Sequence, residues 1–339
     1  MFRNREHQSE VVLSTEDHVD FATDLVHLLT KERQGHMERW EYSPSLFPHD
    51  PAGGSDHWAK LVEEPGNYYL TEGDINNIHH AVAQPELHKL LENIHAVIEL
   101  GPGSTKAIEN KTIPFLKACR NVKKYIAIDE ALEQAKASST HIKNSLSVNV
   151  GVRQQNFMRE KIYSIKSSKT AFVMWGSSLG NIEGGIGQDP YPSLINTLNI
   201  LQSGMKVGDI MLLCFDTEHD EKKVIRAYSD VSLQDQILSI IYRAKRDSYA
   251  SGNFDPRVWR HKPVWDKKHR QCAHIIYPLF DQNIFIGDHR IKIPAWTEIV
   301  SNNSYKFCSD LVIKAAEHCN LRARVFKDGP MALLVAEKL

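Results

Sequence analysis

The sequence predicts an α/β fold in which a mostly parallel sheet, covered by helices on both faces, ends in an antiparallel hairpin. From residue 96 onward, short apolar runs alternate with helical patterns, which is typical of parallel strands buried on both faces. These runs are Ala96–Leu100, Tyr125–Ile128, Val148–Val152, Ala171–Trp175 and Ile210–Phe215. Near the end, Asp328-Gly329 separates the apolar runs 323–326 and 332–336, and this dipeptide is a strong hairpin signal.

The rest of the chain lacks this alternation and predicts a second lobe. Capping residues at Ser14–Asp17 precede apolar residues at helical spacing, which are Val19, Phe21, Leu25, Leu28 and Leu29. A loop rich in Pro, Gly and Ser follows at about residues 43–55, and residues 220–300 are more polar than the strand-rich part. We therefore expect two units, a core at 74–217 and 308–339 and a second lobe at 10–73 and 218–307.

The composition excludes several classes of protein. Among 339 residues, 41 Lys and Arg against 42 Asp and Glu give a net charge of −1, which argues against a nucleic-acid-binding protein. No apolar run approaches the roughly 20 residues that span a bilayer, and the first ten residues lack the apolar segment of a signal peptide. The 17 histidines form no metal-binding motif. We expect a cytoplasmic monomer that holds no metal and binds neither membrane nor nucleic acid.

The sharpest local signal is a glycine-rich turn after the first of these strands. Glu99 ends the strand, and Gly101 and Gly103 lead into a helix, where the absence of Cβ atoms lets the backbone approach a ligand closely. The dinucleotide fingerprint would need a glycine at position 106, where Lys106 stands. That lysine weakens the dinucleotide interpretation. The pattern instead resembles motif I of class I methyltransferases, which implies a nucleoside ligand without a pyrophosphate, and an ordinary tight turn is the alternative.

Two later strand ends carry side chains suited to the rest of such a ligand. Asp129 ends the second strand and can accept both ribose hydroxyls, although a carboxylate there could also be a simple helix cap. After the third strand, Asn156 and Phe157 offer an amide and a ring that suit adenine.

A longer motif gives the sequence a family resemblance. The stretch 173–181 (VMWGSSLGN) resembles the F-x-G-S-x-x-G-N motif of the histidine-specific methyltransferase family. Shorter similarities follow its order at 54–56, 67–71, 216–230, 254–261 and 303–307. The E-x-G-x-G turn also resembles motif I of class I methyltransferases. The resemblance implies a class I, Rossmann-like core that uses S-adenosyl-L-methionine (SAM) and releases S-adenosyl-L-homocysteine (SAH).

The resemblance also implies the residues of a cofactor site. Gly101 and Gly103 would line the methionine part of SAM, and the family's lysine in the next helix falls at Lys106 or Lys111. The full set expected at the cofactor is Glu99, Gly101, Gly103, Lys106, Asp129, Asn156, Phe157 and Gly176.

In this family an amino-acid substrate lies between the two lobes, and the resemblance carries its contacts onto Tyr68, Asn181 and Tyr228. The chemistry agrees, because two phenols and an amide NH₂ can bind a carboxylate without an arginine. The amide oxygen of Asn181 can orient the amine that receives the methyl group. Tyr42 resembles another family tyrosine near that amine.

Departures from the family concern the side-chain pocket. Asn302 stands where the family's histidine reader has a glutamate, two residues before the matching Ser304. The family's methionine against the imidazole falls at Ala273. We expect an N-methyltransferase of the α-amine of a free amino acid or close derivative, with histidine not preferred. The alternatives are a histidine Nα-methyltransferase, a methyltransferase of another small metabolite, and a catalytically silent SAM-binding regulatory protein.

Overall fold

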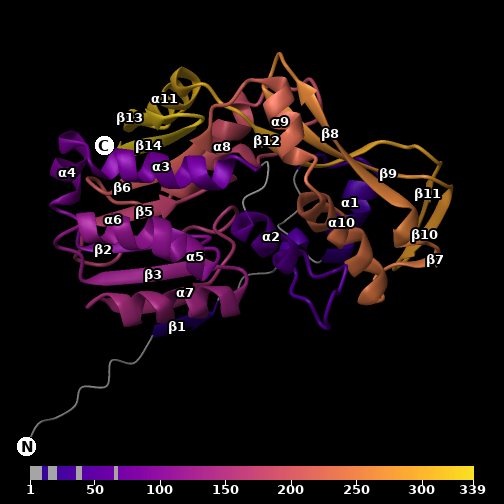
Figure 1. The fold of residues 1–339 in the computed structure, drawn as a ribbon, viewed down its shortest axis with the longest axis horizontal. Helices are drawn as coiled ribbons and strands as arrows, with labels where there is room; N and C mark the ends of the chain where they lie inside the picture. Colours follow the sequence, from indigo (N-terminus) through magenta and orange to yellow (C-terminus); the bar gives the residue numbers. More distant parts are fainter. Residues whose placement is uncertain (1–9, 14–20, 36–39, 65–67) are drawn as a thin grey trace, which may run out of the picture.

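A computed structural model describes residues 10–13, 21–35, 40–64 and 68–339. An eight-stranded sheet and its helices form one side of the molecule, and two three-stranded sheets with further helices form the other (Figure 1). The expected caps at Ser14–Asp17, and also Val19 and Asn67, lie outside the described residues. No helix in the described part of the chain is long and apolar enough to cross a bilayer.

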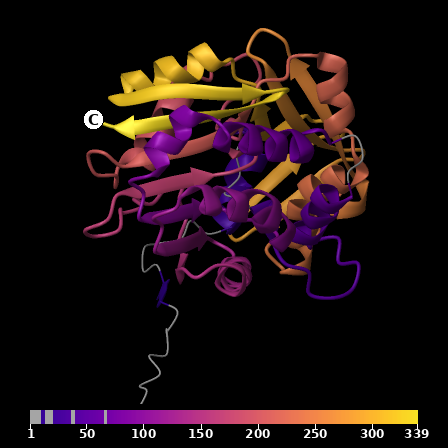
Figure 2. The same ribbon diagram turned by 60° about the vertical axis from the view of Figure 1, so that its left-hand side comes forward.

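The large sheet has the order β1-β4-β3-β2-β5-β6-β14-β13. Its strands are β1 (Glu10–Leu13), β2 (Ala96–Leu100), β3 (Lys124–Asp129), β4 (Asn149–Gln154), β5 (Thr170–Met174), β6 (Ile210–Asp216), β13 (Leu321–Asp328) and β14 (Met331–Lys338). Strands β1 to β6 pair in parallel, and β14 is antiparallel to β6 and β13. Figure 2 shows the yellow β13–β14 hairpin at one edge of the sheet. The predicted fold class is confirmed.

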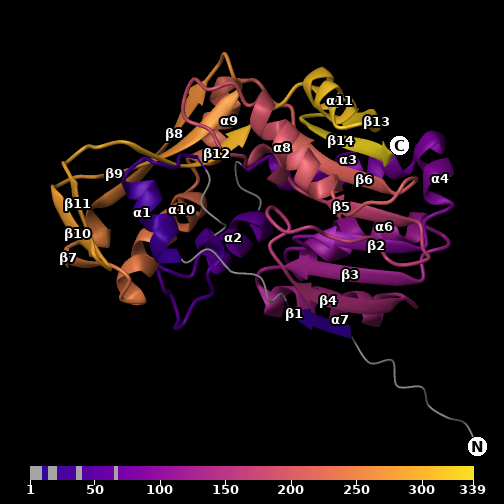
Figure 3. The same ribbon diagram turned by 180° about the vertical axis from the view of Figure 1, so that it is seen from behind.

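Helices cover both faces because the strand residues are apolar on both sides. Val97 packs with α3 (Leu70–Val82), α4 (Pro85–Leu91), α6 (Ile113–Ala118) and α7 (Leu132–Ser145). Its neighbour Ile98 packs on the opposite face with α8 (Tyr191–Gln202) and α11 (Ser309–His318). Figure 3 shows α8 from that second side. A short turn, α5 (Thr105–Ala107) and η2 (Ile108–Thr112), links β2 to α6.

The second group of elements surrounds two antiparallel sheets with the orders β11-β10-β7 and β12-β9-β8. Its strands are β7 (Ser251–Asn253), β8 (Trp259–Asp266), β9 (Gln271–Pro278), β10 (Gln282–Ile286), β11 (His289–Ile293) and β12 (Ile299–Tyr305). Its helices are α1 (Phe21–Leu29), η1 (Trp40–Tyr42), α2 (Gly54–Glu63), α9 (Glu221–Tyr228), α10 (Val231–Arg246) and η4 (Pro256–Val258). An apolar cluster joins α1 and α10 to these strands.

One expected boundary needs correction. Residues 10–13, which we assigned to the second lobe, form β1 and pair in parallel with β4 at the edge of the large sheet. The reason is that β4 would otherwise be the edge strand, and its open backbone groups can be satisfied by any extended segment that reaches them.

Candidate active site

Three glycines lie where β2 and β5 end side by side. Gly101 and Gly103 have φ values of +69° and +72°, which a side chain rarely tolerates. A Cβ on Gly101 would stand 3.4 Å from the ring of Phe157, so the structure brings that ring to the glycine turn. Gly176, after β5, has a φ of +73°, and a Cβ there would meet nothing within 4 Å. This edge of the sheet therefore offers bare backbone beside open space, as a nucleoside cofactor requires.

Asp129 and Asn156 lie at the neighbouring strand ends, as expected. The Asp129 carboxylate accepts a hydrogen bond from the backbone N–H of Ala131 at 2.9 Å. The amide oxygen of Asn156 accepts from the backbone N–H of Met158 at 3.0 Å. These bonds fix the turns after β3 and β4, and both side chains are only half-buried.

Glu99 does not lie at the surface of the turn. It is fully buried, and its two oxygens accept from the Thr112 hydroxyl at 2.7 Å and the Tyr125 hydroxyl at 2.6 Å. Burial raises the pKa of Glu99 to about 7, although the bonds from Tyr125 and Thr112 oppose the shift. The two hydroxyls hold the Glu99 carboxylate inside the core. Glu99 therefore supports the glycine turn from its buried side.

The two candidate lysines bind different partners. The Lys106 ammonium donates to the backbone carbonyl of Glu63 at 2.9 Å, which links the glycine turn to the end of α2. Lys111 instead pairs with Asp74 at 2.8 Å, and Asp74 also accepts the backbone N–H of Gly176 at 2.9 Å. Burial opposes the charge of Lys111, but Asp74 raises its pKa above the ordinary value. Lys111, rather than the expected Lys106, is the lysine connected to the turn at Gly176.

The tyrosines predicted for the substrate come together. The rings of Tyr68 and Tyr228 meet edge to face with centroids 5.9 Å apart. The Tyr228 hydroxyl lies 2.7 Å from the hydroxyl of Ser304 on β12. Trp58 of α2 contacts both Tyr68 and Tyr42 edge to face, at 6.0 and 5.8 Å. Three aromatic residues of the N-terminal part and Tyr228 of α9 therefore form one aromatic wall.

A charged pair that was not predicted from the sequence lies next to this aromatic wall. Lys306 and Asp216 are fully buried, and their side chains form an ion pair at 2.8 Å. The Lys306 ammonium also donates to the Tyr228 hydroxyl at 2.6 Å and the Ser304 hydroxyl at 2.8 Å. Asp216 accepts from the Tyr69 hydroxyl at 2.6 Å. The signal was present, because both charged residues stand beside apolar strand residues within stretches that resemble the family.

Lys306 limits the roles that the two hydroxyls can take. An ammonium group has only donors, so the oxygens of both Tyr228 and Ser304 must accept from Lys306. The Tyr228 hydroxyl has Ser177 as a second side-chain hydrogen-bond partner, so the three hydroxyls carry three hydrogens, and two of them serve the bonds among the three groups. The third remains to be donated to a further acceptor. Asp216 already compensates the charge of Lys306. What suits a carboxylate here is the spare hydrogen, because a hydrogen bond to an anion is roughly twice as strong as a neutral one.

Asn181 is carried on a segment that is packed tightly against β12. It follows η3 (Ser178–Gly180), and a Cβ on Gly180 would stand 2.5 Å from the carbonyl oxygen of Tyr305. The side-chain amide of Asn303 donates to the carbonyl of Ile182 at 3.1 Å. Asn181 itself has an ordinary negative φ of −95° and is half-buried. The polypeptide around Asn181 is thus fixed to the strand that carries Ser304.

The side-chain pocket expected at Asn302 and Ala273 needs one correction. Asn302 pairs with His274 across β12 and β9, whereas Ala273 pairs with Asn303. Ala273 packs with Ile275 and Val300 in a separate apolar cluster, on the other face of the sheet. Because neighbouring strand residues point to opposite faces, a shift of one position exchanges Ala273 for His274 beside Asn302.

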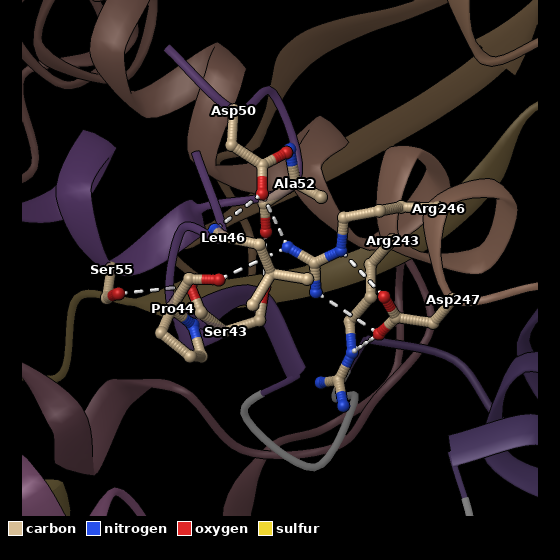
Figure 4. Close-up of polar contacts among 9 residues, drawn as sticks. All are labelled: Ser43, Pro44, Leu46, Asp50, Ala52, Ser55, Arg243, Arg246 and Asp247. Carbon is tan, nitrogen blue, oxygen red and sulfur yellow. Dashed lines mark hydrogen bonds and ion pairs between the residues drawn. The ribbon is translucent and has the colours of Figure 1, made fainter. Parts of the chain in front are cut away.

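A loop between Tyr42 and α2 is anchored outside this site (Figure 4). Asp50 accepts from the backbone N–H groups of Leu46 and Ala52, both at 3.0 Å, and from the Arg246 guanidinium at 2.7 Å. The same guanidinium contacts Asp247 at 2.6 Å. The loop base closes where Ser55 donates to the carbonyl of Ser43 at 3.0 Å. Helix α10 therefore holds the loop that follows Tyr42.

Comparisons with known proteins identify the family of this chain. A family model described as "Histidine-specific methyltransferase, SAM-dependent" matches residues 21–331. The histidine N-alpha-methyltransferase of Mycobacterium tuberculosis (strain CDC 1551 / Oshkosh) is 23% identical over 222 residues, which cover 62% of this chain and 64% of that protein. An uncharacterized protein, y4iF, of Sinorhizobium fredii (strain NBRC 101917 / NGR234) is 21% identical over 225 residues, covering 65% and 72%.

Among solved structures, a S-adenosylmethionine-dependent methyltransferase from Clostridium acetobutylicum ATCC 824 aligns with a TM-score of 0.43 at 9% identity, covering 84% of this chain and 97% of that one. A likeness of that size has no bearing on the substrate. The family model, in contrast, spans nearly all of the chain. The chain belongs to the histidine-specific, SAM-dependent methyltransferase family.

Proposed function

We propose that this methyltransferase transfers the methyl group of SAM to the α-amine of a free amino acid or a close derivative. The observation that carries the proposal is the hydroxyl pair of Tyr228 and Ser304 with Lys306 behind it. Together with Ser177, that pair has a hydrogen to donate, which suits an α-carboxylate, and Lys306 holds both oxygens in place. Tyr68 packs against the same ring and borders the same space.

The cofactor half of the proposal rests on the strand ends of the large sheet. Gly101, Gly103 and Gly176 would face the methionine part of SAM, Asp129 its ribose, and Asn156 and Phe157 its adenine. When bound, SAM supplies an electrophilic methyl group on a sulfonium. In this proposal residues 74–217 and 308–339 are the cofactor core, and residues 218–307, with the N-terminal part from about residue 21, form the substrate lobe.

The protein would act chiefly by alignment. Burial raises the pKa values of Tyr68 and Tyr228 well above the ordinary tyrosine value, so both remain phenols and serve as donors rather than bases. The Asn181 amide oxygen would accept an N–H of the amine and turn its lone pair toward the methyl group. Holding the two reactants in line can contribute on the order of 7–11 kcal/mol to lowering the barrier.

A panel of free amino acids incubated with isotopically labelled SAM and analysed by mass spectrometry tests the proposal. Amino acids should be N-methylated, and their methyl esters should react far more slowly because they lack the carboxylate. Equal turnover of acids and esters, or no turnover of any amino acid, would contradict it.

Two variants separate binding from alignment. Tyr228→Phe should mainly raise KM, because the carboxylate contact is the same in the ground and transition states. Asn181→Ala should also lower kcat, because the amine loses its orientation. Tyr163→Phe, which removes a hydroxyl from an exposed tyrosine, is the matched control and should leave both constants unchanged.

Histidine itself is the second candidate substrate, favoured by the family and by the relative from M. tuberculosis. Asn302 offers an imidazole only a neutral hydrogen bond, whereas a glutamate would offer a charge-assisted one of roughly twice the strength. We therefore expect Asn302→Glu to increase kcat/KM for histidine by about tenfold. A wild type already selective for histidine, with no gain in the variant, would establish the second candidate instead.

A further inference from the structure

Two buried histidines lie on the face of the β8-β9-β12 sheet that carries Asn302. His274 of β9 is the direct cross-strand partner of Asn302, and its ring meets the Tyr228 ring edge to face with centroids 5.1 Å apart. His261 of β8 stacks on His274, and its Nε2 lies 3.0 Å from His274 Nδ1. His274 is thus in contact with the proposed carboxylate-binding tyrosine and opposite the proposed side-chain residue.

Both imidazoles are neutral. Burial lowers the pKa of His261 to about 4. Burial, together with His261 and the Lys306 ammonium, lowers the pKa of His274 well below the ordinary value. Each ring therefore carries a single N–H, and the bond between the two rings uses one of the four ring nitrogens as donor and another as acceptor.

The surroundings of His261 decide which ring is the donor. Its Nδ1 is buried and has no hydrogen-bond partner among the described residues. If His274 donated to His261 Nε2, the His261 proton would have to sit on Nδ1 as a buried, unpaired N–H, the costlier kind of unsatisfied group. If His261 donates from Nε2, its Nδ1 carries no hydrogen and is an unpaired acceptor, which costs less than an unpaired donor. The second arrangement is favoured, and it leaves the proton of His274 on Nε2.

His274 Nε2 lies on the side of its ring away from His261, and the described residues give it no hydrogen-bond partner. The geometry points to His274 as a specificity-determining residue whose Nε2–H donates to an acceptor on the substrate's side chain. His261 is the positioning residue that fixes this tautomer. The inference rests on the proposed function and narrows its substrate class to amino acids whose side chain ends in a carbonyl, hydroxyl or ring-nitrogen acceptor.

Matched pairs of amino acids test the selectivity. Wild-type enzyme should prefer asparagine over leucine, or tyrosine over phenylalanine, by about tenfold or more in kcat/KM, the effect of one hydrogen bond of about 1.4 kcal/mol. His274→Leu should abolish the preference, and His274→Gln should retain it, because the glutamine amide can present an N–H near the position of Nε2. A purely structural role would lower both members of a pair equally and leave their ratio unchanged, which would overturn the inference.

The tautomer can be measured without any substrate. In protein labelled with ¹⁵N-histidine, long-range ¹H–¹⁵N correlations show which ring nitrogen carries the proton, and His274→Gln and His261→Gln assign the signals. We expect both rings to be protonated on Nε2. An unprotonated Nε2 on His274 would overturn the inference whatever the substrate is. If the expected tautomer is present but no amino acid is methylated, only the proposed function is refuted.

Discussion

Lys306 joins parts of the site that sequence analysis treated separately. Its ammonium touches Asp216 at the end of β6, Tyr228 at the end of α9 and Ser304 of β12. A charge in this position is tolerated because the carboxylate and two hydroxyl oxygens replace the water that it has lost. Removing one member of such a pair is expected to cost far more than removing both.

Lys306→Met should therefore lower the free energy of unfolding by about 3–5 kcal/mol, because Asp216 is left as an unpaired buried charge. The double variant Lys306→Met/Asp216→Asn should recover a large part of that loss, and chemical denaturation of the two proteins measures the difference. A double variant no more stable than Lys306→Met would show that the ion pair is not the source of the effect.

Asp129 gives a second prediction at the residue scale. Asp129→Ala should weaken SAH binding by about 1–3 kcal/mol, the range for a hydrogen bond to a charged group. Isothermal titration calorimetry measures the change. Glu133→Ala, which removes an exposed carboxylate from the helix that follows, is the control. Wild-type protein that binds neither SAM nor SAH would contradict the cofactor assignment altogether.

At the scale of elements, the loop after Tyr42 depends on α10. Arg246→Met should destabilise the loop by roughly 1–3 kcal/mol, because Asp50 loses its charged donor. Limited proteolysis should then cut within residues 44–52, and KM should rise more than kcat falls, because Tyr42 loses its support. Arg257→Met, which breaks an exposed ion pair with Asp255, is the control and should change neither.

The same loop should be sensitive to acid. Burial opposes the charge of Asp50, but hydrogen bonds from Leu46, Ala52 and Arg246 lower its pKa below the ordinary value. A carboxylate whose pKa is lower in the folded state stabilises the protein above its unfolded pKa of about 3.9, and this stabilisation is lost as the pH falls through the folded-state value. The loop should therefore become protease-sensitive below about pH 4 before the large sheet unfolds.

Elements buried on both faces were predictable from the sequence. The range of β2 was predicted to the residue, and the other parallel strands shifted by only a residue or two, because their apolar runs are continuous. Strands β7 to β12 were not predicted individually, since each mixes polar with apolar residues. Strand β1 was missed because its place is set by the edge of β4, which no local pattern encodes.

Within the site, residue identity was easier to predict than orientation. Tyr68, Tyr228 and Ser304 came together as expected, because the motifs that carry them are distinctive. Glu99 and Lys106 were assigned to the cofactor, but their side chains bind Thr112, Tyr125 and the Glu63 carbonyl. A side chain's direction depends on partners elsewhere in the chain, so spacing alone could not give it.

At the scale of the whole molecule, Lys106 connects the glycine turn of one half with α2 of the other. SAH at about 100 times its dissociation constant should stabilise the protein by roughly 2.7 kcal/mol. Part of this stabilisation should reach α2, so hydrogen exchange should slow in residues 54–63 as well as in residues 101–107. Lys106→Met should keep the protection of the turn and lose that of α2. Equal protection of α2 in both proteins would contradict this coupling.

The ion pair between Asp216 and Lys306 also joins the two ends of one long insertion. Residues 217–305 leave the large sheet at the end of β6 and return to it at Lys306. The ion pair therefore closes the base of this insertion, which we call the cassette. A chimera that takes residues 217–305 from another family member and keeps Asp216 and Lys306 should bind SAH like its parent. If the chimera binds SAH more weakly than its parent, SAH binding depends on the cassette and the idea is wrong. Under the proposed division into a cofactor core and a substrate lobe, such an enzyme can diversify its choice of substrate while inheriting its methyl-donor site intact.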